Sequence, residues 1–163
     1  MKFLLHVVLW LAITITSTAV YSQEAKLVEY GKWGSAAHIS HVELNGYYYL
    51  LTEANKIDVI DPSLLGEESI VATIDMVEAA GFLDTQIIFS ARLRVLNGKL
   101  VYQGSDRTKV FSVGEDHKLT LIHSQSFEHG QIRYSFVNNG KLYLFDKSKV
   151  HVIAQEGNEF NIS

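Results

Sequence analysis

The 163-residue sequence has no cysteine, so it can form no disulfide, no thiolate metal site and no cysteine nucleophile. It contains one proline, Pro62, which follows Asp61 in an Asp-Pro-Ser turn signal. Lysine and arginine total 14 against 18 acidic residues, and no basic stripe exists, which argues against a nucleic-acid partner. Glycine-rich phosphate loops and a Gly-x-Ser-x-Gly elbow are also missing, so we expect no cofactor and assign no catalytic residue.

The first 22 residues differ in kind from the rest of the chain. Lys2 gives a positive start, residues 3–15 are almost wholly apolar, and small or polar residues follow. This order is typical of a secretory signal peptide, and the apolar run is shorter than the roughly 20 residues of a membrane span. We expect cleavage after Ser22, with cleavage after Ala19 or an uncleaved anchor as alternatives. The mature protein is then periplasmic or extracellular, without a stable membrane span.

Internal repetition is the main signal in the remaining chain, residues 23–163. An Asn-Gly pair lies between two β-rich runs at three places, ending at Gly46, Gly98 and Gly140. The glycines are 52 and 42 residues apart, a spacing typical of propeller blades. Both residues of such a pair tolerate the positive φ of a type I′ turn, so each pair predicts a β-hairpin.

Further strands follow each hairpin. A third strand with alternating polar and apolar residues is predicted at 56–61, 108–113 and 149–153. A fourth is predicted at 69–75 and 118–123, and only its start at 160–163. Residues 26–30 predict a lone upstream strand, and residues 76–83 a single helical turn between units. We therefore expect three units, at about 35–75, 88–124 and 131–163.

The first unit carries a recognisable motif. Residues 48–52 form a tyrosine-rich strand, 57–63 read Ile-Asp-Val-Ile-Asp-Pro-Ser, and 70–74 read Ile-Val-Ala-Thr-Ile. This pattern resembles the blades of YVTN-type and LVIVD-type β-propellers, and the other two units match it in outline only. The resemblance implies an all-β fold of propeller-like, four-stranded antiparallel blades. It implies no function, because such folds host many.

Three units fall short of the four to eight blades of a closed propeller, so the predicted ring is incomplete. Three explanations compete. The chain is a truncated or split piece of a longer propeller, or it assembles with copies of itself into a closed ring, or it folds as another compact β-structure such as a sandwich or barrel. The unfinished final strand favours the first.

Seven histidines raise the possibility of a metal site. His38 and His41 are three residues apart, which in a regular strand places them on opposite faces, so we expect no local pair. The others are His6 in the signal segment, His117, His123 and His129 at six-residue intervals, and His151 on a strand. A metal would need these to converge from separate blades, and we expect exposed or hydrogen-bonded histidines instead.

Two carboxylates and three tyrosines are the other candidates for chemistry. Asp58 and Asp61 flank a strand, where a turn-capping role is expected before a catalytic pair. Alternation along residues 47–49 sends Tyr48 to one face and its two neighbours to the other, as packing residues or as a sugar-stacking platform. The hairpin tips at 105–107 and 115–117 are polar. Asn161 begins a glycosylation sequon, which we discount in a chain of bacterial character.

The sequence therefore predicts an exported, non-enzymatic binding or interaction module, whose partner is a further copy of itself or another protein. The alternatives are a hydrolase or lyase with its site near the propeller axis, and a truncated fragment of a larger propeller protein. Polar residues converging from different units on one pocket would favour the enzyme, and an axis lined by valine, isoleucine and leucine would oppose it.

Overall fold

The computed structural model describes residues 38–80, 91–127, 132–157 and 159–163. The chain divides into two compact units, residues 1–30 and 31–163, and every described residue belongs to the second. The predicted signal segment and the lone strand at 26–30 lie outside the described residues, as do His6, His129 and residues 81–83 of the predicted helical turn.

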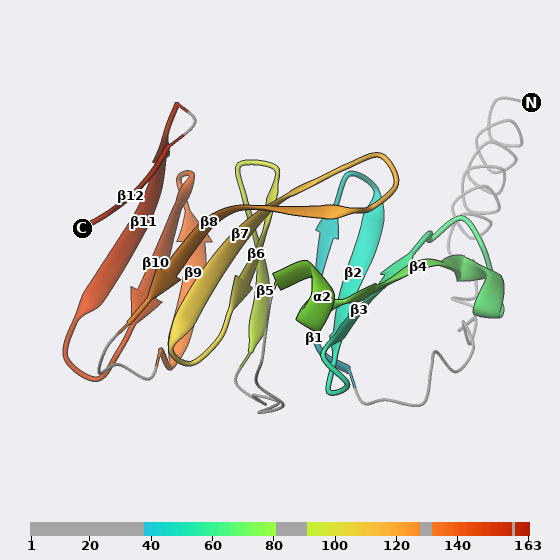
Figure 1. Cartoon of the computed structure of the whole chain (residues 1–163), viewed down its shortest axis with the longest axis horizontal. Coiled ribbons are helices and arrows are strands. Elements are labelled where there is room, and N and C mark those ends of the chain that lie inside the picture. Colours follow the sequence, from blue (N-terminus) through green and yellow to red (C-terminus); the bar gives the residue numbers. More distant parts are fainter. Residues whose placement is uncertain (1–37, 81–90, 128–131, 158) are drawn as a thin grey trace, which may run out of the picture. The chain divides into compact units, whose positions relative to one another are not determined.

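In these described ranges, twelve strands form three four-stranded antiparallel sheets, each with its strands in chain order (Figure 1). The first sheet contains β1 (His38–Leu44), β2 (Tyr47–Thr52), β3 (Lys56–Ile60) and β4 (Ile70–Asp75). The second contains β5 (Arg92–Leu96), β6 (Lys99–Gln103), β7 (Arg107–Val113) and β8 (Leu119–Ser126). The third contains β9 (Tyr134–Asn138), β10 (Lys141–Phe145), β11 (Val150–Glu156) and β12 (Glu159–Ile162). Two short helices, η1 (Gly66–Ser69) and α2 (Met76–Ala80), flank β4.

The three Asn-Gly pairs occupy the same place in each sheet, at the turn between its first two strands. The φ angles are positive at both residues of each pair. They are 55° and 84° at Asn45 and Gly46, and 48° and 68° at Asn139 and Gly140. Asparagine and glycine adopt this region at low cost, and it matches the twist of a hairpin. The predicted equivalence of the three hairpins is confirmed. The final strand is short but paired, because residues of β12 register with β11 from Ile153 to Glu156.

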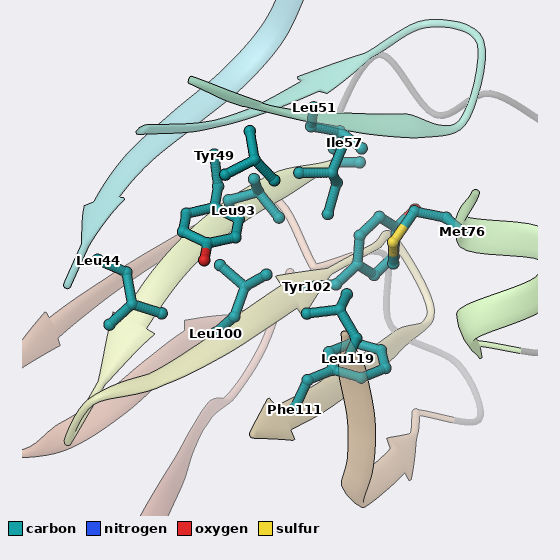
Figure 2. Packing of buried hydrophobic residues seen from close by; sticks show 12 residues of the cluster. Leu44, Tyr49, Leu51, Ile57, Met76, Leu93, Leu100, Tyr102, Phe111 and Leu119 are labelled. Carbon is teal, nitrogen blue, oxygen red and sulfur yellow. The ribbon is translucent and has the colours of Figure 1, made fainter. Parts of the chain in front are cut away.

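The middle sheet supplies both hydrophobic cores, because successive residues of a strand point to opposite faces. In β6, Leu100 and Tyr102 belong to the core shared with the first sheet, and Val101 to the core shared with the third. Figure 2 shows the first core, where Tyr49 and Leu51 meet Leu100 and Tyr102. The first strands also adjoin, β1 beside β5 and β5 beside β9. Sheets stacked in this way resemble propeller blades, and the sandwich or barrel alternative is wrong.

Candidate functional site

The outer face of the first sheet is built from the residues that alternate with its core. Tyr49 is 1% exposed and faces the second sheet, whereas Tyr48 is 39% exposed and lies on the opposite face. Tyr48 and Leu50 stand two and four residues after their turn glycine. Leu100 and Tyr102 stand at the same positions in the second sheet and are buried between blades. The outer face of the first sheet therefore corresponds to the face of the second sheet that is buried between blades.

A groove of about 360 Å³ lies on this face. Its lining surface is mainly apolar and includes a few polar groups, which is the usual composition of a binding pocket. Its lining residues come from β1, β2 and β3: His38, His41, Tyr48, Leu50, Thr52, Asp58 and Ile60.

The predicted separation of His38 and His41 is wrong. Both line the groove, and their ring centroids are 5.2 Å apart. The cause is a register shift in the pairing of β1 with β2 between His38 and Ser40, which breaks the alternation on which the expectation depended. Among the described residues, no group of three histidines, aspartates or glutamates is close enough to hold a metal ion.

The two candidate carboxylates have separate partners. Asp58 lines the groove and accepts a hydrogen bond of 2.8 Å from the Thr73 hydroxyl. Asp61 caps the turn after β3, where its carboxylate accepts the Ser63 hydroxyl at 2.6 Å and the Ser63 amide at 2.8 Å. These hydrogen bonds lower the pKa of Asp61. The turn-capping role of Asp61 is confirmed, and the two side chains do not act as a pair.

The tyrosine run divides between two faces, as alternation predicts. Tyr49 and the imidazole Nδ1 of His117 are within hydrogen-bond distance, at 3.0 Å. The ring of His117 also lies edge-on to Tyr47, with 4.5 Å between centroids. His117 belongs to the β7–β8 turn, so this contact joins the first two blades. Burial raises the pKa of Tyr49. Only Tyr48 of the three is left on the outer face.

The remaining described histidines lie between the second and third sheets. His123 packs against Phe160, with 5.3 Å between ring centroids, and burial lowers its pKa. His151 packs against Phe127 at 4.9 Å, and its Nε2 is 3.0 Å from the Asp146 carboxylate. The two histidines therefore pack against different aromatic residues and do not form a shared site.

The outer face of the third sheet carries an aromatic cluster that sequence reasoning missed. Phe136 and Tyr143 are stacked across β9 and β10, with ring centroids 5.0 Å apart. Phe145 lies 5.6 Å from Phe136, and Tyr134 lies 6.0 Å from Phe145. Tyr134 is 61% exposed. The signal was present in the sequence as alternation, because Leu142 and Leu144 between these aromatics are fully buried on the other face.

Polar groups also meet where the first strands of the blades adjoin. The Ser40 hydroxyl accepts the Leu93 amide at 3.0 Å, and the Arg94 guanidinium donates to the Ser135 carbonyl at 2.9 Å. The Ser135 hydroxyl donates to the Gln103 side-chain carbonyl at 2.8 Å. Burial lowers the pKa of Arg94. These groups bind one another between blades, so they hold the blades in register.

Within the described part of the chain, no helix is long and apolar enough to cross a membrane. No family model matches the sequence, and no curated protein matches it.

Solved structures are similar to this chain in fold. The crystal structure of the Myceliophteria thermophila Cps50 (Swd1) β-propeller domain matches with a TM-score of 0.56 at 12% identity. The match covers 78% of this chain and 41% of the other, so this chain spans less than half the length of that propeller domain. At this identity the likeness shows the fold alone. The chain is all-β, with three four-stranded antiparallel sheets that resemble propeller blades.

Proposed function

We propose that this chain is a non-enzymatic binding module whose groove on the outer face of β1–β4 receives apolar side chains of a protein partner. The observation that carries the proposal is the outward position of Tyr48 and Leu50. Their counterparts in the other two sheets are buried in contacts between blades. An exposed apolar sheet face at such a position is typical of a surface that a partner covers.

The dimensions and chemistry of the groove support this proposal. Its volume of about 360 Å³ accommodates one or two large side chains and is at the lower end of the range for ligand pockets. Tyr48, Leu50 and Ile60 supply apolar contact, and His38, His41 and Asp58 supply hydrogen-bonding groups that would orient a partner. Tyrosine in such a setting is a common anchor of protein interfaces.

We further propose that the module acts after export, in the periplasm or outside the cell, and that its blades are of the YVTN or LVIVD type. The charged, apolar and small-residue order of residues 1–22 supports export. The Ile-Asp-Pro turn of the first unit, with Asp61 as its cap, supports the blade type. The amino terminus of the mature protein, read by mass spectrometry, should be Gln23. A chain that still begins at Met1 would contradict export by cleavage.

The hydrolase or lyase alternative receives less support. Such a site near the axis would need polar groups free to meet a substrate. Arg94, Ser135 and Gln103 instead satisfy one another across the second and third blades. Asp58 on β3 and the two histidines on β1 line the groove on the outer face of the first sheet, where no described residue of the second or third sheet contributes to the lining.

The test is a photo-crosslink from the groove. A p-benzoylphenylalanine placed at Tyr48, in the full chain within cells that produce it, should give an intermolecular adduct whose partner is identified by mass spectrometry. Adding Leu50→Asp should reduce the adduct at least about tenfold, because a carboxylate without a partner resists burial in an apolar contact. Leu65→Asp, in an exposed turn, should leave it unchanged. An adduct insensitive to Leu50→Asp, or none, would refute the proposal.

A further inference from the structure

We propose that the partner of the groove is a second copy of this chain, bound head to tail. The aromatic outer face of β9–β12 in one copy packs on the groove face of β1–β4 in the other, and two such contacts close a ring of six blades. The inference rests on the proposed function, because it names the occupant of the same groove.

Neighbouring sheets of this chain make the same kind of contact twice, and each contact has a forward-facing and a receiving side. The outer face of the third sheet matches the forward-facing side, and the outer face of the first sheet matches the receiving side. Counted from the turn glycine, Tyr143 and Phe145 correspond to Tyr49 and Leu51, which pack forward onto the second sheet. Tyr48 and Leu50 correspond to Leu100 and Tyr102, which receive that contact. Among the described residues, neither core cluster includes a residue from the two outer faces. The forward-facing side of the third sheet and the receiving side of the first sheet therefore have no packing partner within these clusters.

The third strands extend the correspondence. Cross-strand register pairs Tyr49 with Val59 in the first sheet and Tyr143 with Val152 in the third. Ile60 in the groove corresponds to Phe111, which lies in the core beside Leu100 in Figure 2. A head-to-tail contact would thus place Tyr143, Phe145 and Val152 against Tyr48, Leu50 and Ile60. This repeats the apolar pattern of the first internal interface position by position.

Charge favours the same pairing. Lys141 directly follows the turn glycine of the third sheet and shares its outer face with Tyr143 by alternation. Glu43, three residues before the turn glycine of the first sheet, shares the groove face with His41. Their counterparts, Tyr47 and Val95, pack against one core at the first interface. The head-to-tail contact therefore brings opposite charges together, whereas contact between two groove faces would bring two Glu43 and two Asp58 side chains together.

The three sheets that the structure describes favour two copies over three. Propellers close with about four to eight blades, and two copies of three sheets give six, whereas three copies give nine. A heterologous contact of this kind closes into a ring when the rotation fits, and otherwise continues as an open filament. A closed pair leaves no outer sheet face exposed.

The experiment measures the solution mass of the purified full chain and of complementary variants. The unmodified chain should have twice the monomer mass by light scattering. Leu50→Asp in the groove and Phe145→Asp on the aromatic face should each weaken dimerisation at least about 100-fold in Kd, since each buries a carboxylate without a partner. Leu65→Asp, on an exposed turn, should leave the mass unchanged. Circular dichroism and thermal melting of each variant establish that it is folded.

Mixing the two variants distinguishes this arrangement from others. Leu50→Asp retains its aromatic face and Phe145→Asp its groove, so a one-to-one mixture should recover a dimer through one intact contact. A monomeric unmodified chain, loss of dimer in only one of the two variants, or a mixture that stays monomeric would each overturn the head-to-tail pairing. If Leu50→Asp fails to fold, Tyr48→Glu, at a half-exposed position, replaces it. A Tyr48 crosslink to a different protein would support the proposed function and refute this inference.

Discussion

The two contacts between blades are built differently. The first is a large apolar core in which Tyr49, Leu51, Leu93 and Phe111 are fully buried (Figure 2). Its polar contacts include the Ser40–Leu93 hydrogen bond and the Tyr49–His117 pair. The second has a smaller apolar cluster, supplemented by the hydrogen bonds among Arg94, Gln103 and Ser135. The comparison shows that one blade pattern can be joined mainly by packing or by a smaller apolar cluster together with more polar pairing. Packing adapts to several residue combinations, whereas the polar pairing depends on each partner.

The largest effect is expected in the first core. Phe111→Ala should lower the free energy of unfolding by about 3–5 kcal/mol, because it removes a fully buried ring and leaves a cavity. Leu142→Ala in the second core should cost about 2–5 kcal/mol and less than Phe111→Ala. Urea unfolding of both variants measures this. Leu121→Ala, at a 42% exposed position, should change the value by less than about 0.5 kcal/mol. Equal costs at Phe111 and Leu121 would contradict the importance of the first core.

The next effect tests the polar pairing of the second contact. Ser135→Ala should cost about 1–3 kcal/mol, because it leaves the Gln103 side-chain carbonyl buried without its donor. Ser124→Ala, at an exposed position of β8, is the matched control and should be nearly neutral. Equilibrium unfolding measures both. A Ser135→Ala chain as stable as the control would show that the pairing contributes nothing.

The second contact also contains a polar atom without a partner, and removing it should stabilise the protein. The Thr108 hydroxyl is buried and, within the described residues, has no hydrogen-bond partner. Thr108→Val keeps the shape of the side chain and should raise the free energy of unfolding by about 1 kcal/mol. Thr120→Val, at an exposed position, serves as the control. A clear loss of stability in Thr108→Val would mean that the hydroxyl makes a useful hydrogen bond.

The smallest effect is a dependence on pH beside the second contact. Hydrogen bonds from the Ser148 amide, the His151 ring and the Lys149 amide hold the pKa of Asp146 well below its ordinary value. A carboxyl whose pKa is lower in the folded state stabilises the fold above its unfolded pKa of about 4, and this contribution is lost as the pH falls.

The free energy of unfolding should therefore decrease below about pH 4, and Asp146→Asn should make that decrease shallower. Unfolding curves recorded from pH 7 to pH 2 measure the slope. Glu115→Gln, at an exposed turn position, is the control and should keep the slope of the unmodified chain. An unchanged slope in Asp146→Asn would show that this carboxyl does not contribute to acid sensitivity.

The candidate site was predictable only in part. Alternation correctly placed Tyr48 apart from Tyr47 and Tyr49, and it could have revealed the aromatic face of β9 and β10. The pairing of His38 with His41 could not be predicted, because it depends on a register shift that leaves no mark in the local sequence. Export, the finer blade family and the binding function stay predictions.

The sequence by itself determined the hairpins, the number of sheets and the strand order within each sheet. These depend on local chemistry: Asn-Gly pairs that accept positive φ, and β-rich runs that alternate with period two. Only the tertiary structure decided which alternating face is buried. The same positions after the turn glycine are core in the second sheet and outer surface in the first, because burial depends on which sheet is the neighbour.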